Sequence, residues 1–129
     1  MITAALAIMA ALQARAIDWA ALPPLPYRVP PVVTPDMHGF VAREVKARKC
    51  PVPAPAAPGA RLQTLVVGVA VLVDEAGGIR TVVPRAIDCP TVEQFAAALA
   101  AGFARNNLLP RNASAPQWYR ADLSFSWPR

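Results

Sequence analysis

The chain's 129 residues are enough for one domain and leave little for a second. Its 15 prolines lie well above the usual ~5% share and fall mostly in residues 23–35 and 51–58, which indicates connecting segments there. The formal net charge of +5 comes from scattered basic residues without interleaved aromatics, which argues against nucleic-acid binding.

Residues 1–16 have the pattern of a secretory signal peptide. The apolar run 1–12 falls within the ~7–15 residues of such a segment, and an Ala-x-Ala cleavage pattern ends at Ala16. No Lys or Arg precedes the run, so an uncleaved anchor in the inner membrane and a plain amphipathic helix are the alternatives. Extending the run to residue 22 takes in charged residues, which disfavours a spanning anchor. We expect export, with cleavage after Ala16.

Residues 17–35 are expected to form a proline-rich tether. Their prolines favour extended polyproline II, so a short stiff spacer and a proline-rich ligand for a groove are the two interpretations. Trp19 and Tyr27 can attach this tether to the domain that follows, which we place at residues 36–129.

The first helix is predicted to begin at Thr34, with Pro35 at its first position, and to end by Cys50. Its apolar residues recur at helical spacing, and its cations come late, where the helix dipole favours them. His38 is expected on the helix surface, because nothing near it in sequence makes a catalytic arrangement.

A β-hairpin organises the chain. Residues 62–73 are β-branched and apolar, residues 74–78 hold two acids and two adjacent glycines, and residues 79–87 form the partner strand. The hairpin's first run is too short to cross a bilayer as a helix. A single hairpin is marginally stable in water, so we expect the other elements to cover and extend it.

The remaining elements are a helix and a strand. Thr91 is predicted as the N-cap of a helix that continues to Arg105, with Gln94 completing a capping box. The last segment alternates strictly. One face would be buried (Tyr119, Ala121, Leu123, Phe125, Trp127) and the other wet (Trp118, Arg120, Asp122, Ser124, Ser126). The sequence thus predicts an α+β fold of order α-β-β-α-β, a three-stranded antiparallel sheet with both helices packed on one face.

Cys50 and Cys89 are expected to form a disulfide, as a cysteine pair in an oxidising compartment usually does. A metal or redox pair is the weaker alternative, since C-x-x-C spacing is absent and His38 is the only histidine. The sequence also has no nucleophile elbow, phosphate-binding glycine loop or metal-ligand cluster. We therefore expect no enzymatic activity, no metal and no cofactor.

The alternating valines of residues 67–73, the Asp74-Glu75-x-Gly77-Gly78 turn, the helix 91–105, Leu109-Pro110 and the strand 119–127 resemble the C-terminal domain of TonB-family energy transducers. The resemblance covers residues 40–127. It implies a periplasmic domain that binds an extended segment of an outer-membrane transporter as an added strand beside its own last strand.

On this resemblance, the peptide-binding edge would be the last strand, with Trp118, Tyr119, Arg120, Asp122, Ser124 and Ser126. The alternative is that these are ordinary wet-face residues and that the edge is covered or self-paired.

The chain departs from that family in three ways. First, the apolar run 1–12 is too short for the family's transmembrane helix and is expected to be removed, and the family's long spacer is reduced to residues 23–35. Second, the Tyr-Pro start before the hairpin is absent. Third, the cysteine pair is not a general family feature. Two function classes therefore remain. The first is a peptide-binding module acting on transporter segments. The second is a structural envelope protein that self-associates as a homodimer through its sheet edge, or adheres to cell-wall polymer through residues 43–49.

Overall fold

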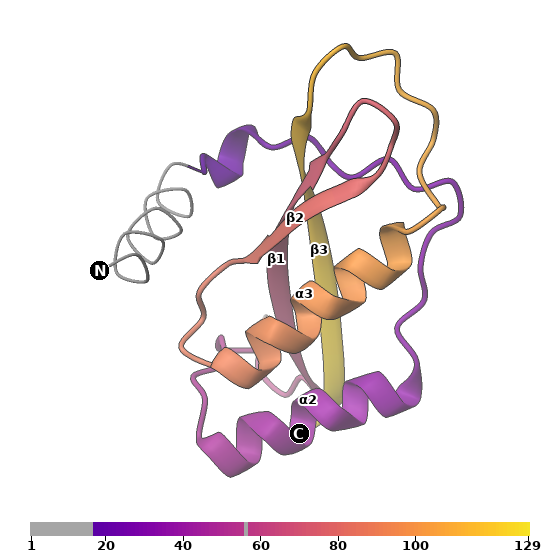
Figure 1. Cartoon of the computed structure of the whole chain (residues 1–129). Coiled ribbons are helices and arrows are strands. Elements are labelled where there is room, and N and C mark those ends of the chain that lie inside the picture. Colours follow the sequence, from indigo (N-terminus) through magenta and orange to yellow (C-terminus); the bar gives the residue numbers. More distant parts are fainter. Residues whose placement is uncertain (1–16, 56) are drawn as a thin grey trace.

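The computed structural model describes residues 17–55 and 57–129; the predicted signal peptide, residues 1–16, lies outside them. Its sheet is antiparallel and three-stranded, in the order β2-β1-β3, and α2 and α3 pack on one face (Figure 1). The predicted α+β fold is confirmed. In chain order the elements are η1 (Trp19–Ala21), α2 (Pro35–Arg48), β1 (Leu62–Val73), β2 (Ile79–Pro84), α3 (Pro90–Ala104) and β3 (Gln117–Pro128).

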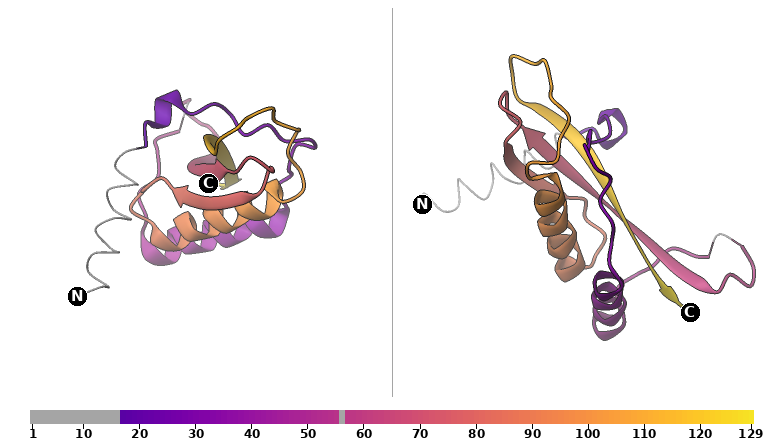
Figure 2. Two further views of the ribbon diagram at one scale, coloured as in Figure 1. Left: turned by 45° about the horizontal axis from the view of Figure 1, so that its top comes forward. Right: turned by 90° about the vertical axis from the view of Figure 1, so that its right-hand side faces the viewer.

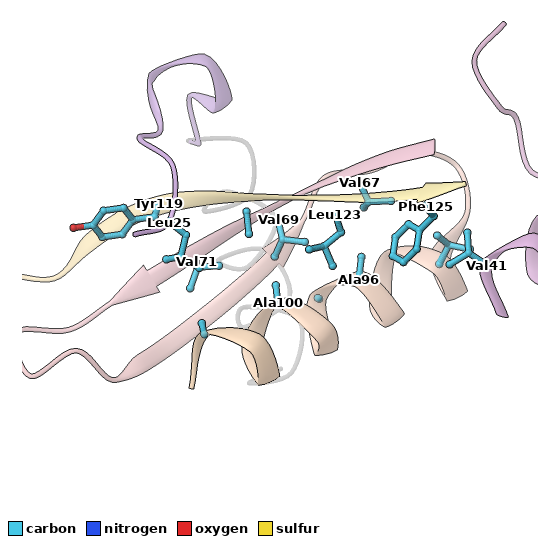
Figure 3. Close-up of a cluster of buried hydrophobic side chains, with 14 of the residues drawn as sticks. Leu25, Val41, Val67, Val69, Val71, Ala96, Ala100, Tyr119, Leu123 and Phe125 are labelled. Carbon is cyan, nitrogen blue, oxygen red and sulfur yellow. The ribbon is translucent and has the colours of Figure 1, made fainter. Parts of the chain in front are cut away.

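The core lies between the sheet and the helices. Odd-numbered residues of β1 from Val67 to Val73 are fully buried, because every second side chain of a strand points to the same face. They meet Leu123 and Phe125 of β3, and small alanines of α3 let the helix approach closely (Figure 3). The predicted burial of Phe125 and Leu123 is confirmed.

The two partners of β1 differ in length. β3 pairs with all of β1, from Leu62 to Val73, whereas β2 pairs only with its residues 69–73. One more hydrogen bond, from the Arg85 N–H to the Gly68 C=O, follows at 2.8 Å. In the described structure, residues 62–67 of β1 and the β3 residues paired with them therefore form a two-stranded ribbon (Figure 1).

The hairpin turn is closed by Asp74. Its Oδ1 accepts hydrogen bonds from the N–H groups of Ala76 (3.0 Å) and Gly78 (2.7 Å). Gly77 has a φ of +84°, a conformation that favours glycine. The acids and glycines that predicted a turn thus have separate roles in it.

The first helix begins as predicted and the second does not. Thr34 accepts the Met37 N–H and caps α2. The N-cap of α3 is Cys89 rather than Thr91, and Pro90 takes the first helical position. The carboxylate of Glu93 accepts the N–H groups of Ile87 and Cys89. These two hydrogen bonds satisfy amides at and before the N-cap, and Pro90 fits the first helical position, so α3 begins ahead of Thr91.

Residues 17–29, here called the N-terminal strap, contact the sheet through Trp19 and residues 23–25. Trp19 lies over Gly68 on the face away from the helices, with the Arg85 guanidinium 5.7 Å from its ring. The strap then passes around the β3 edge, and Leu25 is only 6% exposed in the core on the helix side (Figures 2 and 3). The sequence predicted a tether here that Trp19 and Tyr27 could attach to the domain. The strap packs on the domain because doing so removes apolar surface of Trp19, Leu25 and Tyr27 from water.

Asn107 fastens the end of the strap. Its side chain accepts the Val29 N–H at 2.9 Å and donates to the Val29 C=O at 2.8 Å. Tyr27 forms a bridge with Leu108 nearby. Asn107 and Leu108, which follow the C-terminal end of α3, therefore bind the strap.

The predicted disulfide between Cys50 and Cys89 is present, with a Cα–Cα distance of 5.4 Å. It joins the C-terminal end of α2 to the N-cap of α3. It closes a loop across 39 positions that contains the whole hairpin.

Replacing both Cys50 and Cys89 by alanine is expected to lower the free energy of unfolding by about 4 kcal/mol, because the unfolded chain loses a long covalent loop. Urea denaturation of the oxidised protein and of the double variant measures the difference. Equal denaturation midpoints would contradict it.

We expect Tyr27 to make the stability of the fold depend on pH in the alkaline range. Burial raises the pKa of its phenol above the ordinary value of 10.0. The unfolded chain then gives up this proton more readily than the folded one, so stability falls as pH rises above about 10. The hydroxyl is buried and has no hydrogen-bond partner among the residues described. Tyr27→Phe should therefore raise the unfolding free energy at neutral pH by about 1 kcal/mol and weaken the alkaline fall. Denaturation of both proteins at neutral and alkaline pH tests this; a less stable Tyr27→Phe protein would refute it.

Candidate peptide-binding edge

β3 is an edge strand of the sheet. Of the six residues predicted as a binding edge, five lie on the face away from the helices: Trp118, Arg120, Asp122, Ser124 and Ser126. Tyr119 lies on the other face, is 9% exposed, and belongs to the core. Its side chain contributes to the fold.

The register decides which backbone groups of β3 are open. The Gly68 C=O accepts the N–H of Arg85, directly after β2, so Gly68 and its register partner Asp122 exchange no hydrogen bonds. N–H and C=O groups of a strand residue share one side, and the sides alternate along the strand. The even-numbered residues of β3 therefore direct their backbone groups away from β1, toward the open edge.

The strap occupies this edge at Arg120. The Arg120 N–H donates to the Pro23 C=O at 2.8 Å, and the Arg120 C=O accepts the Leu25 N–H at 2.9 Å. Pro24 forms a parallel bridge with Arg120. The chain thus already adds one extended segment of its own to β3.

His38 occupies the edge further along. Its Nδ1 accepts the Ser126 N–H at 3.0 Å, and its ring lies edge-on to Phe125, with centroids 6.3 Å apart. The sequence placed His38 on the helix surface; the structure places it half-buried against the strand. Its partner is 88 positions away in sequence, so no local pattern indicated the contact.

Between these two positions lies the open window, Asp122 and Ser124. Their N–H and C=O groups have no hydrogen-bond partner within residues 17–55 and 57–129. Both side chains are exposed. The accessible part of the edge is therefore shorter than the run of residues 118–126 that the sequence indicated.

Charges beside the window pair within the protein. The Arg120 Nε lies 3.2 Å from Asp122 Oδ2, with the two side chains 36% and 48% exposed. The same guanidinium donates to the Trp19 C=O at 3.2 Å. An ion pair this exposed contributes little stability. The hydrogen bond to the Trp19 C=O links the Arg120 side chain to the strap.

The described residues also bear on metal binding and on membrane insertion. Among them, no three His, Cys, Asp or Glu side chains lie close enough to hold a metal ion. Nor does any helix in the part of the chain that the structure describes have the length and apolar character needed to cross a membrane.

No family model matches the chain, and no curated protein or solved structure is significantly similar to it. The resemblance to the TonB family therefore rests on the residues that suggested it and stays a prediction.

Leu25→Ala is expected to lower the free energy of unfolding by about 2–4 kcal/mol, because it leaves a cavity in the core and weakens the docked strap. Thermal or urea denaturation measures the loss. Val29→Ala, at a strap position 63% exposed, is the matched control and should change stability by less than about 0.5 kcal/mol. Similar losses in both variants would contradict the docking of the strap through Leu25.

Proposed function

We propose that this protein binds an extended peptide segment by strand addition at residues 122–124 of β3, as a TonB-like periplasmic domain. The observation that carries this is the pair of outward-facing backbone N–H and C=O groups at Asp122 and Ser124. Such groups take up an incoming strand through main-chain hydrogen bonds. The strap supports the proposal, because it already pairs with the outward-facing N–H and C=O groups of Arg120, two residues before Asp122.

The size of the window sets the strength of binding. Each net hydrogen bond contributes about 0.5–1.5 kcal/mol, and ordering the peptide costs much of that gain. We therefore expect dissociation constants on the order of 0.1–1 mM for short peptides. A longer segment would have to displace residues 23–25 or the His38 side chain from the edge.

The cell compartment and the partner follow from the same proposal. A disulfide that staples the two helices suits an oxidising compartment, and the periplasm is one. The TonB resemblance supplies the partner class, the extended segment of an outer-membrane transporter. A role in transport driven by energy transduction would be the further consequence.

A self-associating envelope protein is the second candidate. An exposed strand edge also pairs with a second copy of itself, so the same window at Asp122 and Ser124 supports this reading. The two candidates differ in whether transporter peptides compete with association.

Ser124→Pro tests the proposal at the β3 edge. Proline removes the outward N–H of Ser124, which takes no part in the β1 ladder, and its ring obstructs the incoming strand. We expect at least about tenfold weaker binding of synthetic transporter segments, followed by nuclear magnetic resonance titration.

Ser124→Ala is the control for that experiment. It removes the hydroxyl and keeps the N–H, so binding should stay within about threefold of the parent protein. Circular dichroism shows whether both variants keep the fold. Unchanged peptide binding by folded Ser124→Pro would refute the site. A dimer that Ser124→Pro abolishes and that peptides do not affect would favour the second candidate.

A further inference from the structure

A second open strand edge lies on the opposite side of the sheet. β2 pairs with β1 residues 69–73, and the N-terminal part of β1, residues 62–66, borders a groove of about 930 Å³. Residues 62–66 form one side of the groove, and the loop of residues 51–55 together with Ile87 forms the other. This groove shares no residue with the β3 window.

Backbone groups of β1 face into this side. Because the Gly68 C=O points toward β2, those of Thr64 and Val66 point the same way. The N–H of Thr64 and both groups of Val66 have no partner in the part of the chain described. The Thr64 C=O accepts the Gln63 Nε2 at 3.1 Å. That nitrogen also donates to the Pro53 C=O at 3.0 Å, which fastens the loop beside the strand.

The loop 51–55 and Ile87 are held in place by a disulfide and by a hydrogen bond. The loop starts directly after Cys50, which is bonded to Cys89. Ile87 donates its N–H to Glu93 at 3.2 Å, two residues before that same cysteine. The groove is therefore preformed, which lowers the ordering cost of binding.

The lining is apolar and its charged end is basic. Val52, Leu62 and Val66 are 39%, 53% and 51% exposed, large fractions for aliphatic side chains. Arg61 lines one end, and none of the described residues that line the groove is acidic. The Arg129 guanidinium donates to the C=O of Ala60, a lining residue, at 3.2 Å, so a second cation lies at the same end. Neither arginine forms an ion pair with any residue that the structure describes.

We propose that this groove binds a second extended peptide from another protein, which continues the sheet in the place that β2 leaves empty. The peptide would run antiparallel to β1, as β2 does, and pair with Thr64 and Val66. Apolar side chains at alternate positions would contact the exposed valines and Leu62, and a carboxylate at its C-terminal end would face Arg61.

The groove favours a single peptide over a second copy of this chain. A copy approaching with its own β1 would bring its own loop of residues 51–55 to the same edge. It would also bring its own Arg61 and Arg129 toward a site that already carries two cations. A single acidic-ended strand meets neither obstacle.

The test uses the full chain with its disulfide intact and a fluorescein-labelled probe of sequence Ser-Val-Thr-Val-Ser-Val-Asp with a free C-terminus. Fluorescence anisotropy measures binding. Val66→Pro removes an N–H that is outside the β1–β3 ladder, and should weaken binding at least about tenfold. Val66→Ala keeps the N–H and should stay within about threefold.

Two further variants separate this site from the proposed function. Arg61→Glu should weaken the probe and improve binding of a matched peptide ending in lysine amide. Ser124→Pro should leave probe binding unchanged, so either edge can fail without the other. The proposal is overturned if the probe does not bind, if folded Val66→Pro binds it like the parent, or if Ser124→Pro abolishes binding. It is also overturned if Val66→Pro only changes the oligomeric state.

Discussion

The register of the central strand β1 is the constraint on which the rest of the structure depends. Burial of Val67, Val69, Val71 and Val73 against the helices fixes which side chains face the core. A shift of one residue would turn all of them to the other face, so the register is strongly specified. The same choice directs the even-numbered backbone groups of β1 toward β2 and those of β3 toward the outside. The burial of one face of β1 thus determines which backbone N–H and C=O groups point outward at both edges of the sheet.

Unequal strand lengths turn that register into candidate sites. β3 extends along all of β1, and among the described residues its edge is hydrogen-bonded where the strap meets Arg120 and where His38 meets Ser126. β2 is half as long as β1, so the edge of β1 at residues 62–66 has no strand paired with it on the β2 side among the described residues. Exposed edges promote uncontrolled pairing, and short covered runs are a common protection. The strap and His38 fit that description, and the windows they leave are narrow.

Much of the fold could be predicted from sequence because its signals are local. The β-branched apolar run 62–73 identified β1, and alternation identified β3. The Asp-Glu-x-Gly-Gly turn identified the hairpin, and Thr34-Pro35 identified the start of α2. What could not be predicted depends on partners far apart in the chain. The strap meets β3 some hundred positions away, as Arg120 does with Trp19. The groove exists because β2 ends at Pro84, and the sequence of residues 62–66 does not indicate that they lack a strand partner there. The start of α3 was missed because Pro90 takes the first helical position and Glu93 accepts the N–H of the N-cap residue, Cys89.

Residue-by-residue hydrogen exchange on the free protein tests the central claim most directly. Slow exchange is expected for the amides of Arg120 and Ser126, which have partners on the β3 edge. Fast exchange is expected for Asp122, Ser124 and Val66, although each lies within a strand. Protection of these three equal to that of the inward-facing amides of Ala121 and Leu123 would contradict the account, because it would mean that the edges are already paired.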